Sequence, residues 1–319
     1  MTTDVLTLDP AHPDPSVIAR AAVVIRAGGL VAFPTETVYG LGANALDPAA
    51  VGRIFAAKGR PATNPVIVHV ADTADVLNVA AAWPATAAAL ADRFWPGPLT
   101  LVLPKRASVP DAVTASGQTV AVRCPDHAIA RALIRSAGVP IAAPSANRST
   151  ELSPTLAEHV LKGLDGRIAL VLDGGPCRGG IESTVVDVTG DRVQILRPGL
   201  VTAPMLEAVV GPLDLGRERG EGVARSPGQM ARHYSPRTPV MLVEAAGKPL
   251  LRMGTQDILI GYDGALLPAD PAGYASRLYA RLHELDAAGY DRIIVELPPD
   301  TPEWAGVRDR LLRAAEKGE

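Results

Sequence analysis

Short, largely apolar runs alternate with alanine-rich stretches between Leu30 and Gly199. Many of these runs are apolar at every position, which is typical of strands covered on both faces. The runs that predict strands are 30–34, 65–70, 99–104, 119–125, 140–146, 168–175, 183–189 and 193–199. Because the last of them follow one another without intervening helices, the sequence predicts an α/β domain with a mixed sheet.

Two helices in this region have recognisable start and stop signals. Asp-Pro pairs at 14–15 and 47–48 provide an N-cap followed by proline in the first turn, where its missing N–H costs nothing. Gly-Gly at 28–29 and Gly59 provide the corresponding stops. We therefore expect one helix from about 15 to 27 and another from about 48 to 58.

The composition changes after residue 200. Residues 201–238 contain a short helical pattern and then a stretch rich in Gly, Pro and Arg, which is typical of a linker. Strand patterns and helical patterns then alternate, at 239–244, 257–262, 271–289, 292–298 and 303–317. The sequence thus predicts a domain at 1–200, a linker at 201–238, and a small α/β domain at 239–319.

Composition excludes several classes of protein. Of the 319 residues 47% are hydrophobic, and the formal net charge is −3, so the chain has a core but no overall basic field for nucleic acid. Cys124 and Cys177 lack CxxC spacing, which favours a reducing, intracellular setting. Neither a signal-peptide pattern nor 18 consecutive apolar residues occur. We expect a soluble cytoplasmic protein without a membrane partner.

Polar residues lie within or directly after three of the predicted strands. Thr35, Glu36 and Thr37 come directly after the first strand, where side chains often line a ligand crevice, although an N-cap cluster has the same composition. Arg123 ends another strand and could bind a carboxylate bidentately or form a surface ion pair. His69 lies within an apolar strand, where a satisfied core histidine is the commoner case.

Other segments carry groups suited to phosphate. Lys58, Arg60 and Asn64 share one loop; two cations suit a polyphosphate, but cations also favour the C-terminus of a helix. The hydroxyl and amide groups of 144–149 can bind phosphate or form an ordinary loop. Arg197 before Pro-Gly is a further candidate. Neither a P-loop, a GxGxxG, an HExxH nor a GxSxG motif occurs, and the histidines lack metal-site spacing, so we predict no protein-held metal.

Taken in order, FPTETVYGLGANA, KGRPATNPVIVHV, RFWPGPLTLVL, VAVRCPDH, PSANRS, ESTVVDV and ILRPG resemble the YrdC-like family of threonylcarbamoyl-AMP synthases. The resemblance covers about residues 15–200. SPGQMARHYSP and the α/β unit after it resemble the long form of the family. The resemblance implies a twisted mixed-sheet YrdC-like domain, a linker that serves as an active-site lid, and a small Rossmann-like domain.

The resemblance also assigns site residues. It implies that threonine is held by residues on the strand ends and loops, with Ala143 offering only its backbone: Thr37, His69, Arg123, Ala143 and Ser183, with Thr35 as a neighbour. It implies that ATP contacts lie on Lys58, Arg60, Asn64, Thr119, Ser145, Asn147, Ser153 and Arg197. Tyr234 matches the aromatic residue that closes over the nucleotide, and Lys58 and Arg60 are the residues expected to stabilise the reacting phosphates.

The implied reaction forms threonylcarbamoyl-AMP and pyrophosphate from L-threonine, bicarbonate or CO2, and ATP, as a step toward N6-threonylcarbamoyladenosine in tRNA. Mg²⁺ would arrive with ATP, and a separate tRNA threonylcarbamoyl-transfer machinery would use the product. We expect a monomer, and direct contact with RNA stays open. Two alternatives remain: a double-stranded RNA-binding protein without catalysis, and carbamoyl transfer from carbamoyl phosphate, whose cysteine-rich zinc modules this chain lacks.

Overall fold

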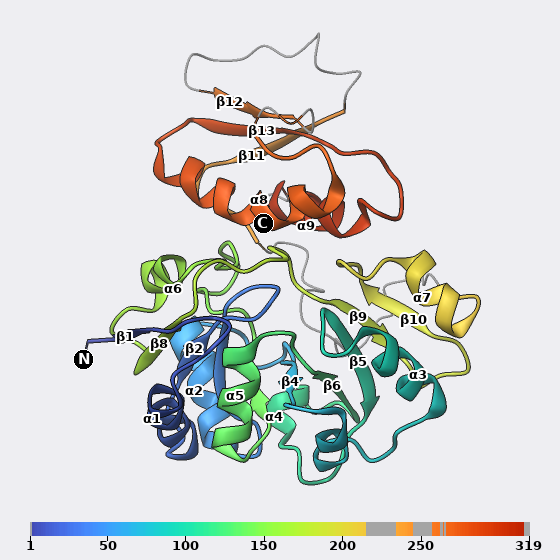
Figure 1. Cartoon of the computed structure of the whole chain (residues 1–319). Coiled ribbons are helices and arrows are strands. Elements are labelled where there is room, and N and C mark those ends of the chain that lie inside the picture. Colours follow the sequence, from blue (N-terminus) through green and yellow to red (C-terminus); the bar gives the residue numbers. More distant parts are fainter. Residues whose placement is uncertain (1, 215–233, 245–256, 262–263, 265, 316–319) are drawn as a thin grey trace.

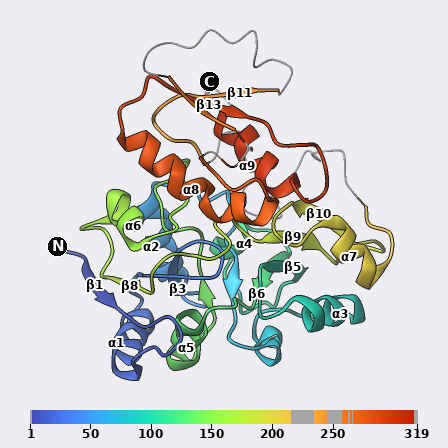
Figure 2. The same cartoon turned by 45° about the horizontal axis from the view of Figure 1, so that its top comes forward.

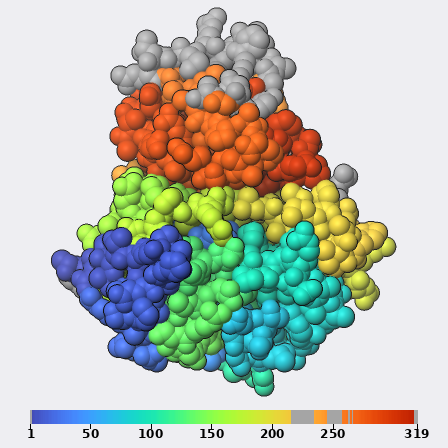
Figure 3. Space-filling view, in the orientation of Figure 1, coloured from blue at the N-terminus to red at the C-terminus, as the bar shows by residue number. Residues whose placement is uncertain are grey.

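The computed structural model describes residues 2–214, 234–244, 257–261, 264 and 266–315. These residues form two α/β units, one built on a ten-stranded sheet and the other on a three-stranded sheet. In Figure 1 the smaller C-terminal unit is stacked on the larger N-terminal unit, and Figure 3 shows the two in direct contact, with green and yellow segments of the larger unit along the boundary.

The large sheet is mixed, as the sequence predicts. Its strands run in the order β1-β8-β2-β3-β7-β4-β6-β5-β9-β10. It contains both parallel pairs, such as β4 with β6, and antiparallel pairs, such as β5 with β6. The strands are β1 Asp4–Thr7, β2 Val31–Phe33, β3 Gly40–Asn44, β4 Val68–His69, β5 Leu99–Pro104, β6 Thr119–Arg123, β7 Ile141–Ala142, β8 Leu170–Asp173, β9 Thr184–Asp187 and β10 Gln194–Arg197. Every predicted run of the large unit contains a strand.

Strand β3 is not among the strands that the sequence predicts. It contains Gly40 and Gly42 and is paired to β2 and β7. A Cβ on Gly42 would lie 2.7 Å from the Phe33 ring and 2.9 Å from Ile141. Glycine is therefore present because large neighbours fill the space above the strand. In a sequence, a glycine needed for close packing cannot be told from a glycine needed for a turn.

The two helices with predicted caps begin and end close to the expected residues. The Asp14 carboxylate accepts a hydrogen bond from the Ser16 amide at 2.8 Å, and Asp47 caps the second helix. Gly59 ends that helix in the left-handed conformation, at φ 64°, which glycine adopts without strain. The helices are α1 Pro15–Arg26, α2 Pro48–Lys58, α3 Ala85–Phe94, α4 Asp111–Thr114, α5 Ala128–Ala137, α6 Ala157–Leu164 and α7 Ala203–Val210, with a 3₁₀ helix at Thr73–Asn78.

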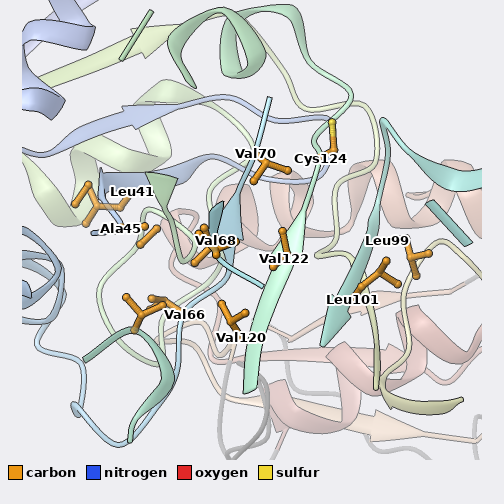
Figure 4. Close-up of a cluster of buried hydrophobic side chains, with 14 of the residues drawn as sticks. Leu41, Ala45, Val66, Val68, Val70, Leu99, Leu101, Val120, Val122 and Cys124 are labelled. Atoms are coloured by element: carbon orange, nitrogen blue, oxygen red, sulfur yellow. The ribbon is translucent and has the colours of Figure 1, made fainter. Parts of the chain in front are cut away.

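Apolar side chains cover both faces of the large sheet, which explains why its strands lack an alternating pattern. Helices α1 and α5 pack together on one face, in a cluster that includes Phe33 and Ile141. Helices α2, α3 and α6 contribute to the other cluster. Figure 4 shows part of that second cluster, where Leu41, Val68 and Val122 come from neighbouring regions of the sheet. The sheet is thus the middle layer of a three-layer unit.

The C-terminal unit has a parallel sheet in the order β11-β13-β12. Its elements are β11 Val240–Val243, β12 Asp257–Ile260, α8 Pro271–Ala287, β13 Arg292–Glu296 and α9 Ala305–Ala315, close to the predicted ranges. Helices α8 and α9 lie between this sheet and the N-terminal unit, and Figure 2 shows α8 over that unit near α6. In the part of the chain that the structure describes, no helix combines the length and apolarity needed to cross a membrane.

Candidate functional site

A cavity in the N-terminal unit brings together loops and strand ends from distant parts of the sequence. Parallel strands β4 and β6 place His69 directly beside Arg123, and the loop after β2 and the residues before β9 complete the wall. Ten of the predicted site residues line the cavity: Thr35, Thr37, Arg60, His69, Arg123, Ala143, Ser145, Ser183, Arg197 and Tyr234. Val38, Gly40, Ile67, Pro144 and Glu182 complete the lining.

One region of the cavity wall holds buried groups with unused hydrogen-bonding capacity. The His69 ring is 3% exposed, and its Nδ1 has no partner among the described residues. Burial, with a smaller effect from the positive charge of Arg123, lowers the pKa of His69 to about 3. The ring is therefore neutral at pH 7, and its Nδ1 is available to a polar group of a ligand.

Arg123 is held from behind by a second buried charge. Its Nε donates to the carbonyl of Gly97 at 3.2 Å, and one terminal nitrogen lies 2.7 Å from an Oε of Glu36. That contact lacks hydrogen-bond geometry, because neither Glu36 oxygen nor this nitrogen has a hydrogen-bond partner among the described groups. The guanidinium is therefore electrostatically anchored while still able to donate to an anion in the cavity.

Hydroxyl groups cluster beside these two residues. The Thr35 and Thr37 hydroxyls are 2.8 Å apart, and the Thr35 hydroxyl donates to the Val38 carbonyl at 2.7 Å. The Ser183 hydroxyl lies 2.8 Å from the hydroxyl of Thr100. This part of the wall can thus bind both a carboxylate and a small polar side chain.

Two further guanidinium groups line the cavity. Arg60 is 7% exposed and donates to the carbonyls of Asn64 at 3.3 Å and Pro65 at 2.9 Å. Arg197 donates to the Ser183 carbonyl at 2.9 Å. Burial lowers the pKa of Arg60 to about 10, against a raising effect of Tyr234, and burial also lowers the pKa of Arg197. Both still carry charge at pH 7, so this part of the cavity favours an anion with several negative oxygens.

Lys58 occupies a different place from the one that the sequence suggests. Its side chain is 1% exposed and does not line the cavity. Its amine donates to the backbone carbonyls of Ser145 at 2.6 Å and Asn147 at 2.5 Å. Burial lowers the pKa of Lys58 well below its usual value. The contacts tie the end of α2 to the underside of the 144–149 loop.

The other predicted residues outside the lining also have identifiable places. Asn64 accepts from Arg60, and Asn147 donates to the carbonyls of Arg148 and Glu151. The Ser153 hydroxyl donates to Glu182 at 2.5 Å. Thr119 begins β6, whereas Arg123 ends it, so the two are separated by roughly 13 Å at the usual strand rise.

Two family models together match nearly the whole chain. The Sua5/YciO/YrdC model, described as telomere recombination, matches residues 23–199, and the model of the threonylcarbamoyl-AMP synthase C-terminal domain matches residues 201–316. The chain is 42% identical to the threonylcarbamoyl-AMP synthase of Bacillus subtilis, over 99% of this chain and 96% of the relative. The chain belongs to the threonylcarbamoyl-AMP synthase family. It is therefore a nucleotidyltransferase.

Relatives from other organisms agree with this membership. The threonylcarbamoyl-AMP synthase of Pyrococcus abyssi is 42% identical over 93% of this chain and 94% of its own length. The crystal structure of P. abyssi Sua5 complexed with L-threonine superimposes with a TM-score of 0.91 at 40% identity, covering 98% of each chain. The mixed α/β architecture of the synthase family is thus confirmed over both units.

The sequence-based assignment of this synthase site missed two acidic residues. Glu36 lies within the polar segment after β2, but its burial behind Arg123 depends on the packing of β6 beside β4. Glu182 precedes the predicted Ser183, yet its ion pair with Arg310, at 2.6 Å, comes from α9 of the C-terminal unit. Their only signal in the sequence is their position next to predicted site residues, since nothing local indicates their partners.

Among the residues that the structure describes, neither a metal-binding cluster nor a reactive thiol is found. Among the described residues, no group of three or more His, Cys, Asp or Glu side chains is arranged to hold a metal ion. Cys124 and Cys177 are free and buried, and burial raises the pKa of each, that of Cys124 to about 11. Both thiols are therefore protonated at pH 7 and poor nucleophiles.

Proposed function

We propose that this cavity forms threonylcarbamoyl-AMP from L-threonine, bicarbonate or CO2, and ATP. The threonine amine attacks the carbon of bicarbonate or CO2 to give a carbamate, releasing water in the case of bicarbonate. A carbamate oxygen then attacks the α-phosphorus of ATP, and the bond to pyrophosphate breaks. The observation that carries this proposal is that one cavity contains both the buried Arg123–His69 pair and a second group of guanidiniums.

The threonine end follows from the chemistry of the lining. Arg123 would bind the amino-acid carboxylate, while the neutral His69 ring, Thr37 and Ser183 would partner the hydroxyl. Valine has nearly the same shape but would leave these buried groups unpaired, which is costly. The crystal structure of the P. abyssi relative with L-threonine supports the choice of amino acid.

The ATP end is assigned to Arg60 and Arg197, with Ser145 supplying a hydroxyl and Tyr234 closing over the nucleotide. Preorganised guanidiniums stabilise the charge that develops on the phosphates during displacement. Mg²⁺ would enter with ATP and keep most of its water. The donor set agrees with this, because the carboxylate that lines the cavity, Glu182, already accepts from Ser153 and Arg310.

Lys58, predicted as a catalytic residue, acts in this proposal through the 144–149 loop. Its three N–H groups are directed at the carbonyls of Ser145 and Asn147 and at the Asn147 side chain. Holding both carbonyls fixes the position of the Ser145 hydroxyl at the cavity wall. A buried amine with these partners is a positioning device for the phosphate-binding loop.

The division into 1–200, 201–238 and 239–319 is part of the same proposal. The separate sheets support it, and the parallel order β11-β13-β12 supports a Rossmann-like character for the last unit. Of the predicted lid, 215–233 lies outside the described residues, while Tyr234 lines the cavity. We place the enzyme in the cytoplasm as a monomer, upstream of the machinery that transfers the threonylcarbamoyl group to tRNA.

The test is incubation with ATP, Mg²⁺, bicarbonate and one amino acid at a time, with mass detection of the adenylate. Threonine should give the carbamoyl adenylate and pyrophosphate. The product yield with valine should be lower by about a hundredfold or more. Arg60→Ala should abolish the product, whereas Arg192→Ala, which removes an exposed arginine, should not. Equal yields with valine, or no threonine-dependent pyrophosphate, would contradict the proposal, and the second result is what a pure RNA-binding protein would give.

A further inference from the structure

The C-terminal unit approaches the cavity through close backbone packing. A Cβ on Gly180 would lie 2.2 Å from the Ala275 carbonyl of α8. A Cβ on Gly306 of α9 would lie 3.0 Å from the Cα of Gly199. Glycine at these positions lets α8 and α9 sit directly against the segments that precede β9 and follow β10. The first segment carries the cavity residue Glu182, and the second directly follows the cavity residue Arg197, which ends β10.

A fully buried arginine lies at this junction. Arg310 of α9 is 0% exposed, and its Nε donates to an Oε of Glu182 at 2.6 Å. Its terminal nitrogens donate to the Pro198 carbonyl at 3.0 Å, to the Glu182 carbonyl at 3.3 Å and to the carboxylate of the neighbouring Asp309 at 2.7 Å. Its guanidinium carbon lies 5.3 Å from the centre of the Tyr234 ring. One side chain of the C-terminal unit thus contacts three segments around the cavity.

Glu182 lines the cavity, whereas Arg310 lies behind it. Its second oxygen accepts from Ser153, and the Tyr279 hydroxyl of α8 donates to the first at 3.2 Å. Burial tends to raise the pKa of Glu182, but Arg310 and Arg197 outweigh it, and the pKa lies below its ordinary value. The group is therefore a carboxylate at pH 7, in the wall that also presents Arg60 and Arg197.

We propose that Arg310 is a positioning and charge-compensating residue for ATP binding, acting from the C-terminal unit through Glu182. A carboxylate in this wall would repel the ATP phosphates unless a cation behind it neutralised its charge. Arg310 supplies that cation without lining the cavity. By holding Glu182 it also directs the carboxylate to Ser153 and away from the phosphates. The inference rests on the proposed function and adds a role for the C-terminal unit that reaches beyond support of a lid.

The experiment removes the two charges separately and together. Arg310→Gln should weaken binding of a non-hydrolysable ATP analogue, measured by calorimetry, on the order of tenfold or more, because it leaves a buried carboxylate unpaired. Adding Glu182→Gln should restore most of that loss, since the repelling charge is then gone. The KM for ATP should rise in Arg310→Gln and fall most of the way back in the double variant. The KM for threonine should change less than about threefold, because any effect on threonine is indirect.

A matched control lies on the same helix. Arg308 pairs with Asp300 at 3.4 Å, and Arg308→Gln removes a similar charge and should leave ATP binding within about twofold. Circular dichroism and thermal unfolding report whether each variant is folded. Should Arg310→Gln prove unfolded, Arg310→Lys retains the charge and is expected to bind the analogue within a few-fold of the wild type.

Several outcomes overturn the inference. These are unchanged ATP affinity in folded Arg310→Gln, a double variant no better than the single one, or a folded lysine variant as weak as the glutamine variant expected above. A merely structural role predicts the second of these results, because removing Glu182 would then add damage. Failure of the wild type to bind the ATP analogue would instead overturn the proposed function, and the inference with it.

Discussion

Two stacked histidines join the units and predict a specific loss of stability in acid. His159 of α6 and His283 of α8 have ring centres 3.8 Å apart, with 20° between their planes. Two imidazolium ions could not remain at this separation in a buried site. Burial lowers the pKa of His159 to about 3 and that of His283 to about 4, in each case with a smaller contribution from a nearby cation.

One hydrogen bond also requires a neutral ring at His159. The Thr155 amide donates to Nδ1 of His159 at 3.3 Å, so that nitrogen must accept and cannot hold a proton. His283 lies 3.2 Å from the Ser153 carbonyl through its Nε2. The charged groups that face the pair are Lys162, which opposes protonation, and Glu158 and Asp286, which favour it.

The sign and magnitude follow from linkage. Above pH 6.5 both rings are neutral whether the protein is folded or unfolded, so stability is intact. Below pH 6.5 the unfolded chain binds protons first, and the free energy of unfolding falls by about 1.4 kcal/mol per pH unit for each histidine. The loss continues until the folded-state pKa near 4 for His283 or near 3 for His159. Between pH 7 and pH 5, His283 alone accounts for about 2 kcal/mol.

The assay is urea unfolding of the wild type and of His283→Gln at half-unit steps from pH 7.5 to pH 4.5. The difference in unfolding free energy between the two proteins should shift by about 2 kcal/mol between pH 7 and pH 5, in favour of the variant at low pH. His12→Gln, which removes an exposed histidine, is the control. A difference between wild type and His283→Gln that does not change with pH would refute the reasoning, whatever its value at pH 7.

Three further predictions concern the site. Lys58→Met should raise the KM for ATP about tenfold or more with little change in the KM for threonine, because the carbonyls of Ser145 and Asn147 lose a buried donor; steady-state kinetics with each substrate varied will check this. Gly199→Ala should lower the thermal midpoint by several degrees, because its Cβ would lie 2.6 Å from the Thr184 amide nitrogen; differential scanning calorimetry measures it. Removing Mg²⁺ with EDTA should abolish adenylate formation and leave calorimetric threonine binding within about twofold, because the ion accompanies ATP.

The local fold could be read from the sequence because it depends on local physics. The Asp14 and Asp47 caps, the stop at Gly59 and the continuous apolar runs each specify an element through neighbouring residues alone. Strand β3 was missed because its Gly40 and Gly42 serve packing against Phe33 and not a turn. The short strand β1 was missed as well, since four partly exposed residues carry little pattern.

The candidate site could be predicted in part. Motif order indicated which side chains belong together, and ten of them line one cavity. It could not separate a residue at the wall from one beneath it: Lys58 and Arg60 are two positions apart, yet one binds carbonyls under a loop and the other lines the cavity. That difference depends on where the 144–149 loop passes, far away in the sequence.

By itself, the sequence determined most of the secondary structure, the family and the set of residues available for chemistry. The tertiary structure alone decided which charges compensate one another. Glu36 lies behind Arg123 and Glu182 lies against Arg310, 128 residues away. The reason is physical: a buried charge is stable only with a partner at contact distance, and contact distance across the chain is fixed by how strands and helices pack, which no short stretch of sequence contains.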